Sequence, residues 1–258
     1  MNSKPVGKAS SEILHGRYLA GHDPELIWGW KTPAGRLRAE RRANLIMAAA
    51  VLKVGKRVLE VGCGTGLFTE KFARSGAQII AVDISEELIQ LAKKKNLPEN
   101  QVRLMVRRFE DCEEEGPFDA VIGSSILHHL EVRQALTRIY ALLKPGGIMS
   151  FAEPNMLNPQ IFVQKNVPAV KRYMGDSPDE TAFFKWQIRK ILDRCGFVSV
   201  SILPYDWLHP YTPRPLIQIV TTVGGVFEKT PVICEFAGSL HITCRRPSDS
   251  RSGYQRHV

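Results

Sequence analysis

Between residues 57 and 152 the chain alternates short apolar runs with longer amphipathic segments. Five runs rich in β-branched residues indicate buried strands, at 57–61, 78–82, 102–106, 118–123 and 148–152. Segments between them carry apolar residues at helical spacing, as at 67–74 and 132–143. We therefore predict a parallel sheet that is covered by helices on both faces.

The same pattern continues outside this stretch. Helices are predicted at 35–52 and 186–195, and two further strands at 198–203 and 239–244 bring the total to seven. The predicted fold class is therefore α/β, with a doubly wound, mostly parallel seven-stranded sheet. Residues 216–227 form a helix with one apolar face, which we expect to be buried in the core. An apolar substrate site or a membrane surface is the alternative for that face.

Composition divides the chain into five parts. Residues 1–34 form an N-terminal arm, and residues 35–153 form the main part of the α/β core. Residues 154–185 contain several Pro and Asn residues and no clear strand, so we interpret them as an insertion with two short helices. Residues 186–246 return to the same core, and we predict that residues 247–258 are a disordered tail.

The bulk composition, 44% hydrophobic and 24% charged residues, is typical of a soluble globular protein. We expect a cytoplasmic protein without a transmembrane segment, because the chain shows no signal peptide or long apolar run and its five cysteines are widely spaced. A net charge of +9 could attract nucleic acid or anionic lipid. The basic clusters, including Arg36 to Arg42, are short, and we interpret most of them as solvated faces.

A glycine-rich loop follows the first strand and precedes a helix, with the sequence Gly62-Cys63-Gly64-Thr65-Gly66. Glycines allow the sharp turn and the close approach of a ligand, and Asp83 ends the next strand, where a carboxylate can accept hydrogen bonds from ribose hydroxyls. A dinucleotide site is the competing interpretation. Leu67 follows where that motif has a further glycine, and the carboxylate of Glu60 would repel a pyrophosphate but tolerate a sulfonium. The spacing therefore favours S-adenosylmethionine.

Four segments in this order, VLEVGCGTG, AVDIS, FDAVIGSSILHHL and LLKPGGIMSF, resemble the class I methyltransferase family. The resemblance covers about residues 58–153 and implies a seven-stranded sheet whose last strand is antiparallel. It also implies that the N-terminal arm and the insertion form a lid. It implies cofactor contacts for the glycine loop and for the ends of the next three strands, namely Glu60, Gly62, Cys63, Gly64, Asp83, Ile84, Phe109, Glu110 and Ser124.

Within that set, the resemblance implies that Asp83 and Ile84 hold the ribose and adenine. Phe109 and Glu110 would flank the adenine, and Ser124 would lie near the methyl group. Many relatives have Gly-Asp-Ala after the third strand, where this chain has Arg107-Arg108-Phe109. Asp111 is therefore an alternative to Glu110.

The candidates for acid–base chemistry are His128 and His129, which follow the fourth strand at the carboxyl edge of the sheet. A histidine titrates near neutral pH and could remove a proton from the methyl acceptor. We expect one of the pair to face the pocket; in the alternative, one only packs into the next helix. Glu153, at the end of the fifth strand, could face the substrate or be structural. No metal site is predicted.

We predict an S-adenosylmethionine-dependent methyltransferase of a small molecule, natural product or lipid-linked intermediate, acting at oxygen. The first alternative is an RNA methyltransferase, which the charge of +9 and the Arg36 to Arg42 cluster would favour. The second is a catalytically silent S-adenosylmethionine-binding protein. Peripheral membrane contact is compatible with the apolar helix, and the sequence leaves the oligomeric state and the acceptor open.

Overall fold

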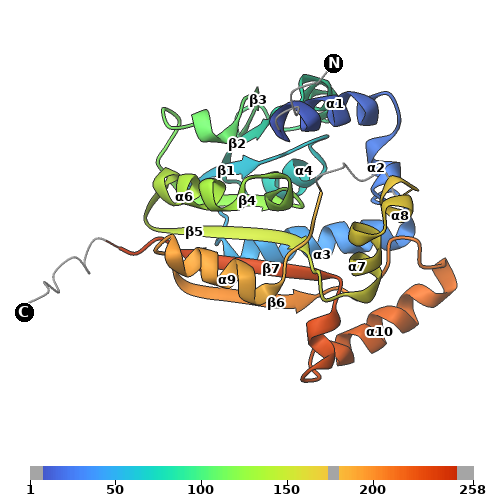
Figure 1. Ribbon diagram of the computed structural model, residues 1–258. Helices are drawn as coiled ribbons and strands as arrows, with labels where there is room; N and C mark the ends of the chain where they lie inside the picture. Colours follow the sequence, from blue (N-terminus) through green and yellow to red (C-terminus); the bar gives the residue numbers. More distant parts are fainter. Residues whose placement is uncertain (1–7, 174–179, 249–258) are drawn as a thin grey trace, which may run out of the picture.

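A computed structural model describes residues 8–173 and 180–248 of the chain. Its centre is a single seven-stranded sheet with the order β3-β2-β1-β4-β5-β7-β6 (Figure 1). The strands are β1 (Arg57–Val61), β2 (Gln78–Asp83), β3 (Val102–Val106), β4 (Phe118–Ser124), β5 (Leu143–Pro154), β6 (Val198–Tyr205) and β7 (Ser239–Arg245). All seven predicted strands are confirmed.

The pairing of the strands gives the sheet its mixed character. Strands β1 to β5 pair in parallel, whereas β7 runs antiparallel to both of its neighbours, β5 and β6. The doubly wound, mostly parallel sheet with an antiparallel last strand is therefore confirmed. Strand β5 is longer than the predicted strand at 148–152, because it also includes the Lys144–Gly147 segment.

Helices cover both faces of the sheet, as expected for a doubly wound fold. One face carries α3 (Pro33–Ala49), α4 (Leu67–Ala73) and α5 (Glu86–Lys93), and the other carries α6 (Val132–Leu142) and α9 (Lys185–Arg194). Each group buries an apolar stripe against the strands and forms its own core cluster. Ser85 caps α5, with its hydroxyl accepting from the amide of Leu88.

The remaining elements gather around the carboxyl ends of the central strands. They are α1 (Lys8–Ala20), α2 (Pro24–Ile27), α7 (Pro159–Asn166), α8 (Pro168–Tyr173), α10 (Ile217–Phe227) and four short 3-10 helices, η1 (Phe109–Asp111), η2 (Leu127–His129), η3 (Arg214–Leu216) and η4 (Ile233–Phe236). The two short helices predicted in the insertion are α7 and α8. Most of the predicted disordered tail, residues 249–258, lies outside the described residues.

Helix α10 corrects one expectation. Its apolar face was expected to be core, but only Ile217 and Gly224 are buried. Leu216, Ile219 and Val223 are exposed instead. Periodicity alone could not distinguish the two outcomes, because an apolar stripe looks the same in sequence whether or not another element covers it. In the part of the chain that the structure describes, no helix has the length and hydropathy needed to cross a membrane.

Candidate active site

A cavity of about 490 Å³ lies at the carboxyl ends of β1, β2 and β4. This is the edge of an open α/β sheet where ligands bind. The N-terminal arm, the insertion and the segment after β6 also contribute to its lining, through residues such as His15, Gln164 and Trp207. Of the eleven predicted site residues, all except Glu60 line this cavity.

The glycine loop forms one wall of the cavity. Gly62 and Gly64 both have positive φ, 68° and 52°, a conformation that favours glycine. A Cβ on Gly62 would lie 2.4 Å from the side chain of Ile126, so no larger residue fits there. The loop is tied to the N-terminal arm, because the Thr65 hydroxyl donates to Glu25 Oε1 at 2.9 Å. The backbone therefore forms a shallow cradle that is open to a ligand.

The carboxylate of Asp83 is hydrogen-bonded to the glycine loop. Its Oδ2 accepts from the amide of Gly64 and its Oδ1 accepts from the amide of Ser85, both at 2.9 Å. Burial raises the pKa of Asp83, and these backbone hydrogen bonds oppose the rise. Each carboxylate oxygen keeps a second lone pair for a ligand hydroxyl. The position agrees with the predicted ribose contact.

Glu60 lies behind the loop and not in the cavity wall. Its side chain is buried, and Oε2 has no hydrogen-bond partner among the described residues. Burial raises the pKa of Glu60 to about 8, so the carboxyl group is mostly protonated at neutral pH. A neutral group would not repel a pyrophosphate, which removes that part of the argument against a dinucleotide. The other part of that argument is unaffected, because Leu67 still occupies the position where a dinucleotide-binding motif has its third glycine.

The predicted adenine side of the site is assembled at the ends of β2 and β3. Ile84, Phe109 and Glu110 all line the cavity there, whereas Asp111 does not. Phe109 is buried at the start of η1, and its ring belongs to the same apolar cluster as Val61 and Val82. The geometry therefore favours Glu110 over the alternative Asp111.

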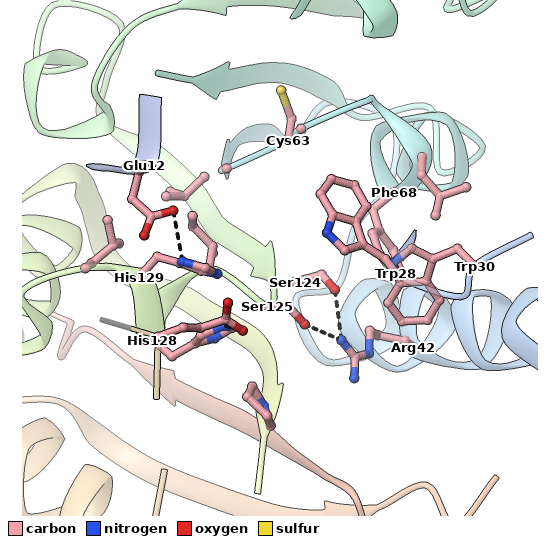
Figure 2. Close-up of a pocket in the computed structure, with 18 of the residues that line it drawn as sticks. Glu12, Trp28, Trp30, Arg42, Cys63, Phe68, Ser124, Ser125, His128 and His129 are labelled. Carbon is pink, nitrogen blue, oxygen red and sulfur yellow. Dashed lines mark hydrogen bonds and ion pairs between the residues drawn. The ribbon is translucent and has the colours of Figure 1, made fainter. Parts of the chain in front are cut away.

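A buried arginine from α3 lines the cavity next to the serines at the end of β4 (Figure 2). Arg42 Nη1 donates to Ser125 Oγ at 2.7 Å and to Ser124 Oγ at 3.3 Å, and Nη2 donates to Ser239 Oγ at 2.8 Å. The guanidinium also lies over the Trp30 ring, 5.3 Å from its centroid. Among the described residues the hydrogen-bond partners of this guanidinium are all neutral hydroxyl groups.

The other arginines of the cluster at residues 36–42 are mostly paired. Arg38 forms an ion pair with Asp206 at 2.8 Å, and Arg41 forms a bidentate pair with Glu228. The interpretation of this cluster as a solvated basic face is therefore wrong for most of its members. Ion pairs with Asp206 and Glu228 therefore neutralise positive charge that would have favoured the binding of a nucleic acid.

The two candidate bases both line the cavity, in different surroundings. His128 is buried, and its Nδ1 lies 2.6 Å from Oε2 of Glu153 while its Nε2 lies 3.4 Å from Oε1 of Glu180. Glu153 is itself buried outside the cavity wall, and its Oε1 accepts from the amides of Ile126 and Leu127. Glu153 therefore orients His128 and does not face a substrate.

The carboxylates determine the charge of His128. Burial opposes protonation, but the hydrogen bonds to Glu153 and Glu180 outweigh it and raise the pKa of His128 to about 9. Glu180 belongs to the insertion and is also paired with Lys165 of α7. In this arrangement the imidazole is protonated at neutral pH.

His129 is the more accessible of the pair. Its Nδ1 lies 3.1 Å from Glu12 Oε2 of α1, and the two histidine rings lie 4.2 Å apart between centroids. The ligand atoms of His128, His129 and Glu180 lie within 4.8 Å of one another. We interpret this group as a hydrogen-bonded cluster and not as a metal site, because the ammonium of Lys165 already occupies the Glu180 carboxylate.

Comparison with known proteins agrees with this geometry. Residues 58–147 match the model of a family described as a methyltransferase domain. This match covers about a third of the chain. A ubiquinone biosynthesis O-methyltransferase from Xanthomonas campestris pv. campestris is 42% identical over 133 residues, covering 50% of this chain and 56% of that protein. The chain thus spans about half the length of the curated relatives it matches.

Solved structures extend the likeness to the whole fold. An S-adenosylmethionine-dependent methyltransferase from Archaeoglobus fulgidus superposes with a TM-score of 0.61 at 19% identity, covering 86% of this chain and 100% of that one. The N-methyltransferase NodS from Bradyrhizobium japonicum WM9, solved with S-adenosyl-L-homocysteine, gives 0.61 at 17% identity, covering 92% and 100%. The fold is that of class I S-adenosylmethionine-dependent methyltransferases.

No sequence motif assigned a role to two parts of the site. Arg42 was placed in a surface cluster, although its helical spacing from Ala39, Ala43 and Ile46 was a signal that it shares the buried face. The segment 206–211, with Trp207 and Tyr211, lines the cavity but carried no motif. Its role follows from the sheet order, which returns the chain to the cavity after β6.

Proposed function

We propose that the chain is an S-adenosylmethionine-dependent methyltransferase that transfers a methyl group to the oxygen of a small molecule or a lipid-linked intermediate in the cytoplasm. The buried guanidinium of Arg42, which lines the same cavity as the glycine loop and has only neutral hydrogen-bond partners among the described residues, carries the proposal. S-adenosylmethionine has a carboxylate at one end and an adenosine at the other. The cavity offers a cation at Arg42 and a carboxylate at Asp83 for these two ends.

The residues present fit that cofactor. Gly62 and Gly64 leave open the cradle that a Cβ would fill, and Cys63 adds a thiol that burial keeps neutral by raising its pKa. Asp83 and Ile84 would hold the ribose, and Phe109 with Glu110 would flank the adenine. Ser124, held by Arg42, would lie near the reacting end. When bound, S-adenosylmethionine supplies an electrophilic methyl group on a sulfonium.

An acceptor hydroxyl must lose its proton as it is methylated. We assign this proton to Nε2 of His128, because the hydrogen bond from Nδ1 to the buried Glu153 fixes the tautomer and the ring orientation. In the described arrangement Nε2 faces Glu180. Nε2 carries a proton in this arrangement, so it can act as the base only after the insertion moves Glu180 away and Nε2 releases that proton to solvent. His129 is the alternative base.

The arm and the insertion would act as the lid over the acceptor. Trp28 and Trp30 of the arm line the cavity, and Glu12 of α1 reaches His129. Such cover excludes water from the reacting groups. The similar Xanthomonas proteins are named ubiquinone biosynthesis O-methyltransferases, which supports oxygen as the acceptor atom.

A transfer assay tests the proposal and separates the alternatives. The full chain is incubated with methyl-labelled S-adenosylmethionine and either an organic extract of cells or total RNA. We expect label in the organic extract, and its transfer should be lost in His128→Asn. Label in nuclease-sensitive RNA would support the RNA methyltransferase instead. Binding of S-adenosylmethionine without transfer to either pool would support the silent binding protein.

A further inference from the structure

Helix α10 exposes an apolar stripe. Leu216, Ile219, Val223 and Val226 are separated by three, four and three residues, so they lie along one side of the helix. Ile219 is 59% exposed and Val226 is 60% exposed. The opposite side, with Ile217 and Gly224, is buried, and a Cβ on Gly224 would come within 2.8 Å of Trp207. The helix thus packs against the protein through the side that carries Gly224, and its larger apolar side chains point to the outside.

The segment after α10 also exposes apolar side chains. Val232 is 72% exposed and Phe236 is 40% exposed. Val232 has a φ of 68°, which is rare for a β-branched residue, so the turn holds an exposed apolar side chain in a strained conformation. Figure 1 shows α10 standing at the edge of the molecule, away from the sheet.

The apolar stripe itself is uncharged, and a basic residue lies near each of its ends. Residues 215–227 contain no charged side chain, while Arg214 precedes them and Lys229 follows them. The carboxylates that come next, Glu228 and Glu235, are paired with Arg41 and Lys185. The segment therefore presents an apolar middle with a positive charge at each end, on a chain with a net charge of +9.

We propose that α10 docks the protein on an anionic lipid bilayer, lying in the interface with its apolar stripe in the acyl boundary. Basic side chains at both ends would reach the lipid phosphates, as they do in interfacial helices. A bilayer also accounts for the stripe and the charges together, because a protein partner with a matching apolar face would not require the two flanking cations.

The position of α10 relates the docked face to the cavity. Trp207, on which Gly224 packs, lines the cavity, as do Pro210 and Tyr211 of the segment that leads into the helix. Docking would bring this rim of the cavity close to the bilayer surface. The inference concerns binding and holds whether or not methyl transfer is found.

Vesicle co-sedimentation of the full chain tests the proposal. Vesicles of phosphatidylcholine alone are compared with vesicles of phosphatidylcholine and phosphatidylglycerol. We expect binding to the anionic vesicles that weakens as salt is raised. Ile219→Gln with Val223→Gln should reduce partitioning at least about tenfold, because two apolar side chains no longer enter the membrane. Arg214→Gln with Lys229→Gln should reduce binding to the anionic vesicles roughly fivefold per charge.

Val54→Gln is the matched control, since Val54 is an exposed apolar residue in the turn before β1 and should leave binding unchanged. Calorimetric measurement of S-adenosylmethionine binding shows independently whether the variants are folded. The proposal is overturned if the native chain binds neither vesicle, or if the Ile219/Val223 variant binds as the native chain does. It is also overturned if sedimentation equilibrium shows a dimer that this variant dissociates, since the stripe would then contact a second copy.

Discussion

His128 and Glu153 come from different elements, yet Nδ1 of the histidine lies 2.6 Å from Oε2 of the glutamate, and both side chains are buried. Two backbone amides hold the other carboxylate oxygen, so Glu153 cannot turn away. This anchors the imidazole and assigns its Nδ1 proton, which leaves Nε2 for chemistry. The pair thus orients the imidazole that we propose as the base.

Replacing that base should slow methyl transfer without affecting the cofactor. We expect His128→Asn to lower kcat by about 10²- to 10⁴-fold, the usual contribution of a positioned base. The affinity for S-adenosylmethionine, measured by calorimetry, should stay unchanged. His22→Asn, at an exposed histidine, serves as control. If His128→Asn keeps full methyl-transfer activity and His129→Asn loses it, His129 and not His128 is the base.

The pH dependence of the rate should follow the carboxylate on the insertion. Burial opposes the charge on His128, but the hydrogen bonds to Glu153 and Glu180 hold its pKa at about 9, so the neutral base forms only as the pH rises toward that value. Glu180→Gln removes a negative charge that stabilises the imidazolium. The pKa should fall, and kcat should reach its plateau at lower pH. Glu114→Gln, at an exposed acid, should not shift the profile, and an unshifted profile in Glu180→Gln would contradict the assignment.

The same raised pKa also makes a prediction for stability. The imidazolium of His128 stabilises the fold fully below its ordinary pKa of 6.5, and this contribution is lost as the pH rises through about 9. In His128→Asn the free energy of unfolding, measured with urea across this range, should therefore lose that part of its pH dependence. An identical pH dependence in both proteins would show that the ion pairs are not formed.

Arg42 should recognise the carboxylate of the cofactor. Arg42→Lys keeps the charge but loses the planar fork, so we expect the affinity for S-adenosylhomocysteine to fall on the order of tenfold or more. Binding of 5′-methylthioadenosine, which lacks the carboxylate, should be little changed. Arg36→Lys on the same helix is the control. An equal loss for both ligands would mean that Arg42 acts only through packing.

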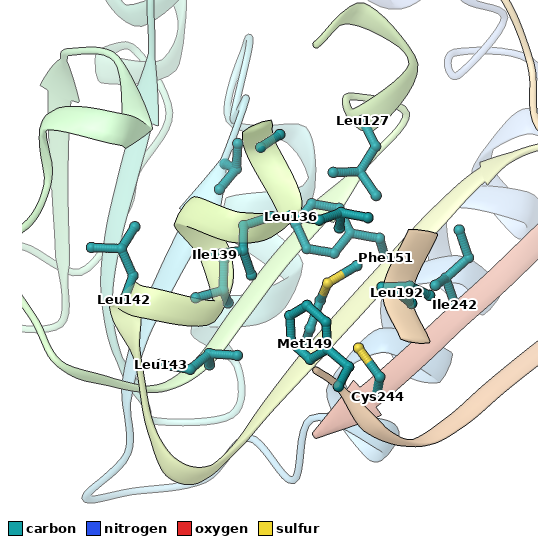
Figure 3. Packing of buried hydrophobic residues seen from close by; sticks show 14 of the residues in the cluster. Leu127, Leu136, Ile139, Leu142, Leu143, Met149, Phe151, Leu192, Ile242 and Cys244 are labelled. Carbon is teal, nitrogen blue, oxygen red and sulfur yellow. The ribbon is translucent and has the colours of Figure 1, made fainter. Parts of the chain in front are cut away.

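The core between α6 and the sheet should be sensitive to cavities. Leu136 of α6 packs among Leu127, Ile139 and Phe151 and is fully buried (Figure 3). Leu136→Ala should lower the free energy of unfolding by about 2 to 5 kcal/mol. Leu203→Ala, at an exposed leucine of β6, should change it by less than about 0.5 kcal/mol. Equal effects in urea denaturation would contradict the packing of α6.

The strands and the glycine loop could be predicted because local sequence determines them. A five-residue apolar run such as 57–61 becomes β1, and Gly62 and Gly64 adopt the positive φ that the loop requires. Given the strand order β3-β2-β1-β4-β5, right-handed crossovers place the connecting helices of the two halves on opposite faces of the sheet. Asp83 then reaches the loop because parallel strands end at one edge.

What sequence could not predict depends on contacts between distant segments. Arg38, Arg41 and Arg42 look alike along the chain, and only the packing of α3 sends Arg42 to the serines after β4. The dyad of His128 with Glu153 joins β5 to η2, and neither residue alone indicates it. The exposure of Ile219 on α10 likewise depends on no element covering it.

Calorimetric titration with S-adenosylmethionine tests the central claim most directly. The native chain should bind one molecule, Asp193→Asn at an exposed position should bind equally well, and Asp83→Asn should lose measurable affinity because the loop and the ribose share that carboxylate. The absence of binding by the native chain would contradict the account.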